Sequence, residues 1–236
     1  MRRFFAASAA FAALVAVPTA GAKVIEVGQT TAAPAPVPAC STPTSPCLAI
    51  SRTTGYQAKV GTNRGLMTVP MTGRIVAWSV TLSQPSAPQI KYFDKVLGGP
   101  AQAGIAVLRF GPHLHDKLMR SGPLELLAPY FGSTAQFPLS RTLYVKKGDA
   151  IALTVPSWAP ALQVSLANDT SWRASRFAKN CKDNTSQTAH VTAGTIKQYA
   201  CLYRGARLTY SATLVTNPQR TDQPAKKPAT TKKTTR

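Results

Sequence analysis

The 236-residue sequence predicts an all-β protein, a single antiparallel β-sandwich resembling a jelly roll, with disordered termini. Short apolar segments alternate at period two, glycine and proline separate them, and only 117–127 has room for a helical turn. The 19 prolines fall mostly between the strand-like segments, where they remove no hydrogen-bond donor from a sheet. Many short strands at such spacing are typical of sandwiches and barrels.

The clearest two-strand signal is the stretch 143–156, where two alternating apolar runs flank Lys146-Lys147-Gly148-Asp149. This pattern predicts a β-hairpin whose turn holds Gly148 in the left-handed conformation and uses Asp149 as a turn residue. We therefore expect a structural turn here rather than a phosphate-binding loop.

Other strands are expected on the same grounds. In 73–82, one face carries Val76, Trp78, Val80 and Leu82, and Trp78 is expected in the core. In 206–214, every second residue from Leu208 is apolar. The remaining expected strands are 104–110, 66–69, 135–139, 162–166 and 199–203.

The N-terminus has the pattern of a secretory signal peptide over residues 1–22. Arg2 and Arg3 precede an apolar run, and the small residues Ala20-Gly21-Ala22 offer a cleavage site. The run is too short for a transmembrane helix, which needs about 20 apolar residues. The sequence thus predicts an exported protein, secreted or associated with the cell envelope, with no transmembrane segment in the mature chain.

Composition divides the rest into three parts. Residues 23–39 are rich in Pro, Thr and Ala and predict a mobile linker. Residues 40–216 carry the strand signals and are numerous enough for one β-sandwich domain. Residues 217–236 form a basic Lys/Pro/Thr tail without apolar residues, which predicts disorder.

The formal net charge is +20, and it is spread over the chain. Residues 40–216 hold 19 basic and 6 acidic residues, and the tail 217–236 holds 6 basic and 1 acidic. An exported cation of this size is attracted to anionic polysaccharides of the envelope or the extracellular space, and to nucleic acid only non-specifically. The alternative is that the charge only keeps the protein soluble.

The four cysteines of an exported chain predict two disulfides. Three pairings are possible, and we favour the local one, Cys40–Cys47 and Cys181–Cys201. The competing zinc hypothesis lacks any Cys-x-x-Cys spacing.

The sequence contains one metal-like cluster, His113-Leu114-His115, to which His190 is a candidate third ligand. This spacing resembles the His-x-His of cupins, and Lys147-Gly148-Asp149 resembles part of their second motif. No Glu follows His115 at short spacing and no His follows Pro156 at short spacing, so we expect surface histidines, no metal and no cofactor.

Catalytic motifs are also missing from the sequence. It has no Gly-x-Ser-x-Gly or His-Glu-x-x-His, and its few carboxylates form no recognisable pair. We expect a protein that is not an enzyme; the less favoured alternative is a hydrolase or metal-dependent enzyme of unknown substrate.

Two tryptophans among polar or proline-rich neighbours carry the binding hypothesis. Trp158 is expected on a loop rim and Trp172 in a polar segment, where exposed indoles would offer flat platforms to sugar rings. The alternative is that both close the ends of the sandwich. The polar candidates for contacts with sugar hydroxyls or carboxylates are Asn168, Asp169, Arg173 and Arg176.

In layout, residues 40–216 resemble exported bacterial β-sandwich proteins that are similar to lectin-like, carbohydrate-binding jelly rolls. The resemblance transfers no binding residue, and the tryptophans and the positive charge lead us to expect a non-catalytic protein that binds anionic glycans. The alternative is a structural or adhesive envelope protein that uses its basic tail. The sequence does not indicate an oligomeric state.

Overall fold

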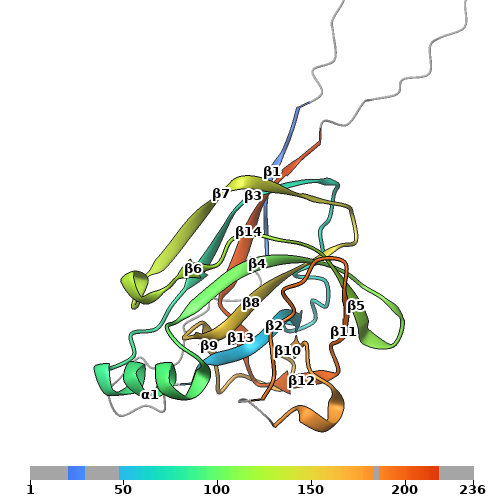
Figure 1. The fold of residues 1–236 in the computed structure, drawn as a ribbon. Coiled ribbons are helices and arrows are strands. Elements are labelled where there is room, and N and C mark those ends of the chain that lie inside the picture. The colour runs from blue at the N-terminus through green and yellow to red at the C-terminus, as the bar shows by residue number, and fades with distance from the viewer. Residues whose placement is uncertain (1–20, 30–47, 183–185, 218–236) are drawn as a thin grey trace, which may run out of the picture. The chain divides into compact units, whose positions relative to one another are not determined.

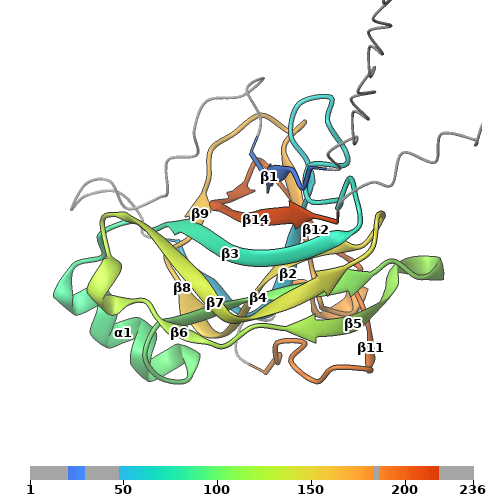
Figure 2. The same ribbon diagram turned by 90° about the horizontal axis from the view of Figure 1, so that it is seen from above.

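Two antiparallel sheets face each other across one hydrophobic core in the computed structural model, which describes residues 21–29, 48–182 and 186–217 (Figures 1 and 2). The strands are β1 (Val24–Val27), β2 (Ile50–Lys59), β3 (Gly73–Thr81), β4 (Gln102–Arg109), β5 (His115–Ser121), β6 (Glu125–Leu126), β7 (Thr134–Val145), β8 (Ala150–Ala159), β9 (Leu162–Gln163), β10 (Ser171–Ala174), β11 (Ile196–Gln198), β12 (Cys201–Arg204), β13 (Arg207–Leu208) and β14 (Tyr210–Thr216). The helix α1 spans Ala87–Leu97, and short 3-10 turns span Pro112–Leu114, Ala128–Tyr130 and Ala178–Asn180.

The first sheet has the strand order β1-β14-β3-β7. The second has the order β11-β5-β4-β8-β2-β10-β12, with β6 added beside β4, and β9 pairs with β13 in a small ribbon. Pairing is antiparallel throughout these sheets, which confirms the predicted all-β class.

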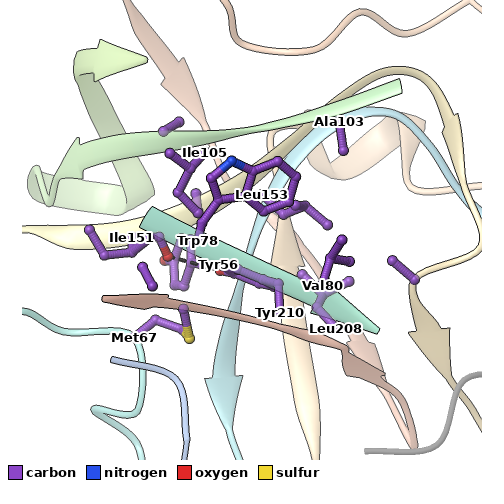
Figure 3. Packing of buried hydrophobic residues seen from close by; sticks show 14 of the residues in the cluster. Tyr56, Met67, Trp78, Val80, Ala103, Ile105, Ile151, Leu153, Leu208 and Tyr210 are labelled. Carbon is purple, nitrogen blue, oxygen red and sulfur yellow. Dashed lines mark hydrogen bonds between the residues drawn. The ribbon is translucent and has the colours of Figure 1, made fainter. Parts of the chain in front are cut away.

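The core lies between the two sheets. Trp78 of β3 is fully buried, and its ring lies 4.8 Å from that of Phe137. Figure 3 shows Trp78 beside Ile105 and Leu153 of the second sheet. Tyr210 of β14 reaches across to donate its hydroxyl hydrogen to the Ile151 carbonyl at 2.9 Å, and burial raises the pKa of this tyrosine.

The expected hairpin over 143–156 is wrong, although its turn is present. The Asp149 N–H donates to the Lys146 carbonyl at 3.0 Å, and Gly148 has a φ of +89° in the left-handed region. However, β7 pairs with β3 in the first sheet, whereas β8 pairs with β2 and β4 in the second. The turn is therefore a corner between sheets, because the core separates the two apolar runs.

Asp149 fixes this corner. Its carboxylate accepts the Lys146 N–H at 2.9 Å and forms a salt bridge with Arg109 of β4, also at 2.9 Å. The Gly148 N–H donates to the Val69 carbonyl at 2.9 Å. The segment 66–69, predicted as a strand, instead makes this contact and an isolated bridge between Thr68 and Ala150.

The helix lies where no helix was predicted. Residues 117–121 belong to β5, whose Leu118 pairs with Leu108 of β4, so the expected helical turn in 117–127 is wrong. The helix α1 begins after Ser86, whose N–H donates to the Gln89 side chain at 2.7 Å, and ends at Gly98, where φ is +93°.

The remaining strand predictions are largely confirmed. Strand β3 matches 73–82, but a register shift between Ile75 and Ala77 leaves Val76 only half-buried and puts Ile75 in the core. The segment 206–214 divides into β13, which pairs with β9, and β14, which pairs with β1 and β3.

The folded unit begins earlier than residue 40. Val24–Val27 form β1 and pair with β14, and Lys23 donates its backbone N–H to the Thr216 hydroxyl at 2.9 Å. The expectation that residues 23–39 are all linker is thus wrong at their start, because long-range pairing orders these residues. Residues 1–20, 30–47 and 218–236 lie outside the described residues, and with them most of the expected signal peptide, linker and tail. Within the part of the chain described, no helix is long and apolar enough to cross a membrane.

Candidate functional site

Trp158, expected on an exposed loop rim, is fully buried. It lies within β8, which extends to Ala159, and its side chain packs against two phenylalanines. The distance between ring centroids is 4.9 Å to Phe93 of α1 and 5.6 Å to Phe131. The indole N–H donates to the Asp94 carboxylate at 2.8 Å. The prediction of an exposed platform at Trp158 is wrong, because this side chain joins α1 to the second sheet.

Trp172 is also buried, with 5 % of its surface exposed. It lies in β10 and stacks on Tyr203 of β12, with ring centroids 4.6 Å apart. A Cβ added at Gly55 would lie 2.9 Å from this indole, so the ring is closely packed on its other side as well. An exposed platform at Trp172 is therefore wrong too.

The four polar candidates do not converge on one site. Arg176 is buried and donates to the Ser51 carbonyl and the Tyr203 hydroxyl, both at 2.7 Å. Arg173 donates instead to the Tyr199 carbonyl at 3.3 Å. Asn168 and Asp169 lie in an exposed turn before β10. Of the six predicted residues, only Trp172 and Arg176 line the same hollow, which measures about 300 Å³.

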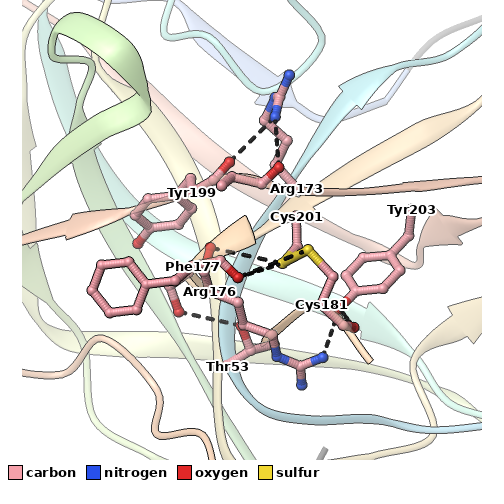
Figure 4. Close-up of a disulfide and its surroundings, with 10 residues drawn as sticks. Thr53, Arg173, Arg176, Phe177, Cys181, Tyr199, Cys201 and Tyr203 are labelled. Carbon is pink, nitrogen blue, oxygen red and sulfur yellow. Dashed lines mark hydrogen bonds between the residues drawn. A yellow bond between two sulfur atoms is a disulfide. The ribbon is translucent and has the colours of Figure 1, made fainter. Parts of the chain in front are cut away.

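The Cys181–Cys201 disulfide is confirmed (Figure 4). It ties the segment after the 3-10 turn Ala178–Asn180 to the start of β12, and the Tyr203 hydroxyl donates to the Cys181 carbonyl at 2.5 Å. Cys40 and Cys47 lie outside the described residues.

Beside this disulfide lies a better-formed hollow of about 400 Å³, which we name the Phe177 pocket. Its walls come from the start of β5, from β11, and from the segments on either side of the disulfide. The lining residues are His115, Ser175, Phe177, Ser186, Gln187, Thr188, Ile196, Lys197 and Gln198.

The rim of the Phe177 pocket is apolar. Phe177 is 56 % exposed and Ile196 is 59 % exposed, which are high values for such side chains. Figure 4 shows the Phe177 ring lying away from the disulfide. The pocket therefore presents an accessible aromatic face.

Polar groups at the floor of the pocket are held by hydrogen bonds. The Ser175 hydroxyl accepts the Thr54 N–H at 3.0 Å and contacts the Thr53 hydroxyl at 3.2 Å. The Lys197 ammonium donates to the Thr188 carbonyl at 3.0 Å and the Ala189 carbonyl at 3.2 Å. Burial lowers the pKa of Lys197.

The electrostatic environment of the pocket is positive. Lys197 lines it, and Arg52 donates to the carbonyl of the lining residue Gln187 at 2.9 Å. None of its lining residues, as far as the structure describes them, is acidic. Asp116 follows His115 in β5 but is 1 % exposed, and burial raises the pKa of its carboxyl group.

A buried histidine anchors the segment that closes the pocket. His190 exchanges two hydrogen bonds of 3.0 Å with Thr54, through its backbone N–H and its carbonyl. Its ring nitrogens contact the Tyr199 hydroxyl at 3.1 Å and the Thr195 hydroxyl at 2.9 Å. Burial, assisted by nearby Lys197, lowers the pKa of His190 to about 4, so this ring is neutral at neutral pH.

The histidines are thus engaged separately. His113 lies in an exposed 3-10 turn with a φ of +53°, and both ring nitrogens of His190 have hydroxyl partners. Across the described ranges, no three His, Cys, Asp or Glu side chains are grouped so as to hold a metal ion.

In comparisons with known proteins, no family model, curated protein or solved structure matches this chain. The candidate site therefore depends on its own geometry.

Sequence reasoning missed the Phe177 pocket, although one signal was available. Phe177 follows Arg176 and lies just before Cys181, where the polar insert closed by the disulfide begins and few apolar neighbours in the sequence could bury it. An aromatic residue in such an insert is more exposed than a tryptophan in a strand.

Proposed function

We propose that this protein is a non-catalytic binding protein for anionic glycans, and that the Phe177 pocket is its binding site. The observation that carries the proposal is the exposed Phe177 ring, which lines the same pocket as the hydrogen-bonded Lys197 ammonium. The binding mode expected from the sequence is kept, but its aromatic residue is Phe177 instead of Trp158 or Trp172.

Each part of the pocket matches a part of a sugar acid. An aromatic face packs against the apolar C–H face of a sugar ring. The side-chain amide of Gln198, which lines the pocket, offers both donors and an acceptor to hydroxyl groups. A carboxylate on the same sugar would approach Lys197, which makes the local charge positive.

The expected export of the protein indicates where its ligand would be found. With residues 1–22 acting as a signal peptide, the protein would reach the envelope or the extracellular space, where acidic polysaccharides are ligands for a chain whose net charge is still +18 (26 − 8) after Arg2 and Arg3 are removed.

A direct test measures binding of an acidic polysaccharide, such as polygalacturonate, to the chain and to two single variants. Phe177→Ala is expected to weaken binding about tenfold by removing the stacking contact. Tyr92→Ala is the matched control, because Tyr92 is a 60 % exposed aromatic residue on α1. Equal binding by all three proteins would refute the site.

The adhesive alternative, in which the basic tail alone binds, is tested by shortening the chain to end at Asn217. This protein retains the compact unit Lys23–Asn217 and is expected to keep the Phe177-dependent binding. Complete loss of binding on shortening, or in moderate salt, would instead favour the tail.

A further inference from the structure

A second hollow of about 480 Å³ lies between the two sheets, and we name it the arginine groove. One wall is the end of β5 in the second sheet, and the other is β7, which forms an edge of the first sheet. Its lining residues are Met119, Arg120, Ser121, Gly122, Pro123, Ser140, Arg141, Leu143 and Ala193.

The two walls carry matching polar groups. Arg120 and Ser121 come from the β5 wall, and Ser140 and Arg141 come from the β7 wall. The Arg120 guanidinium lies 5.5 Å from the centre of the Tyr144 ring and donates to the Tyr144 carbonyl at 3.3 Å, so it is held in place across the gap. Within the described residues, no acidic side chain lines this groove.

We propose that the arginine groove binds a sulfate or phosphate ester group. A carboxylate has two oxygens in one plane and satisfies one guanidinium fork. A tetrahedral ester presents oxygens in several directions, so it can accept from Arg120 and Arg141 on opposite walls and from a serine hydroxyl. Donors on two facing walls therefore favour the tetrahedral anion.

Strand β5 connects this groove to the Phe177 pocket. His115 lines the pocket at one end of β5, and Ser121 lines the groove at the other, about 20 Å away at ~3.3 Å per residue. Lys117 is exposed between them, on the same face as His115. If the proposed glycan-binding function holds, the ligand is an extended glycan that carries sulfate or phosphate esters, with its sugar in the pocket and an ester in the groove.

The test titrates the full chain with dextran sulfate and with carboxymethyl dextran of equal charge density, at fixed ionic strength. The chain is expected to bind the sulfated polymer more tightly. The double variant Arg120→Lys/Arg141→Lys keeps the net charge but loses both guanidinium forks, and should lose about tenfold in affinity for dextran sulfate alone.

The matched control is Arg64→Lys/Arg204→Lys, which makes the same chemical change at two exposed arginines outside the groove. It should bind both polymers as the unchanged chain does. Thermal unfolding checks that each double variant is folded, and the single variant Arg141→Lys repeats the comparison without disturbing the Arg120–Tyr144 contact.

The proposal is overturned if the chain does not prefer sulfate over carboxylate, or if the control pair loses as much affinity as the groove pair. It is also overturned if the groove pair weakens only the binding of duplex DNA, which would assign the groove to nucleic acid.

Phe177→Ala separates the two proposals. If it weakens binding to both polymers while no sulfate preference exists, the glycan site stands and the ester site fails. If a sulfate preference depends on Arg120 and Arg141 but not on Phe177, the ester site stands and the glycan site fails.

Discussion

Trp158 and Phe177 are both aromatic residues next to polar segments, yet the structure uses them in opposite ways. Trp158 has no exposed surface, has two aromatic neighbours, and donates its N–H to Asp94. Phe177 is 56 % exposed on a segment held by a disulfide. The available packing partners, more than the size of the side chain, therefore decide whether an aromatic residue is buried in the fold or exposed for recognition.

The charged groups near Trp158 and near Phe177 also differ. The region of Trp158 contains a carboxylate that satisfies a buried donor, whereas the pocket of Phe177 contains Lys197 and His115. The first region is complete within the chain, and the second presents an aromatic face and a positive charge to solvent.

The largest expected effect is that of Trp158→Ala on stability. Removing a fully buried tryptophan leaves a cavity between α1 and β8, and should lower the free energy of unfolding by about 3–5 kcal/mol. Urea denaturation measures this. Phe177→Ala is the matched comparison and should change the free energy of unfolding by no more than about 0.5 kcal/mol. Similar losses in both variants would remove the distinction between the two residues.

Replacing both cysteines, as Cys181→Ser/Cys201→Ser, should have the next largest effect. The disulfide closes a loop with a sequence separation of 20 residues, and opening it should cost about 3 kcal/mol in thermal or urea unfolding. Because this loop carries Ile196, Lys197 and most other lining residues of the Phe177 pocket, binding of the acidic polysaccharide should weaken as well. Trp158→Ala, studied where it is still folded, should retain binding. Unchanged ligand affinity in the cysteine variant would show that the pocket does not depend on the disulfide.

A smaller effect is expected from Asp94→Leu, which removes the acceptor of the Trp158 indole N–H. Leaving this buried donor without a partner should cost about 1–3 kcal/mol of unfolding free energy. Asp94→Asn keeps a side-chain oxygen and is expected to recover most of that loss. If both variants were equally unstable, the charge of Asp94 and not the hydrogen bond would be responsible.

The last predicted effect is a pH dependence of stability that arises from the buried His190. The pKa of His190 is about 4 in the folded chain and 6.5 ordinarily, so the unfolded chain binds the extra proton between these values. The contribution of neutral His190 to stability is therefore complete above pH 6.5, falls as the pH drops toward 4, and is constant below that.

His190→Gln is the variant that isolates this contribution. The buried carboxyl group of Asp116 has a raised pKa and acts in the opposite direction, so the difference between the chain and the variant is the quantity to follow by urea denaturation. A difference that does not change between pH 4 and 6.5 would contradict a buried neutral imidazole.

Much of the local structure was predictable because it depends on neighbours in sequence. The alternation in 73–82 and 206–214 marks strands, and the left-handed Gly148 and its Asp149 form the expected turn. The helix α1 was missed although its signals are local, namely Ser86 with Gln89 at its start and Gly98 after its end. The capping residues in the sequence are therefore sufficient to predict both ends of this helix.

The candidate site was predictable only in kind. The sequence indicated an exposed aromatic residue among polar groups and cations, in the polar part of the chain between residues 158 and 176. The structure buries both tryptophans and exposes Phe177 one residue further on. The two tryptophans are buried because Trp172 packs against Tyr203 and Trp158 packs against Phe93. Both partners are distant in sequence.

By itself, the sequence determined the all-β class and most strand positions, since period-two alternation is a local property. It favoured Cys181–Cys201 among three possible pairings, and the structure confirmed that disulfide. Only the tertiary structure decided that β7 and β8 leave their shared turn for different sheets, and that β1 pairs with β14 at the far end of the chain. It alone also placed the ends of β5 in two polar hollows. These features depend on which apolar faces meet across the core, and that choice involves residues far apart in the chain.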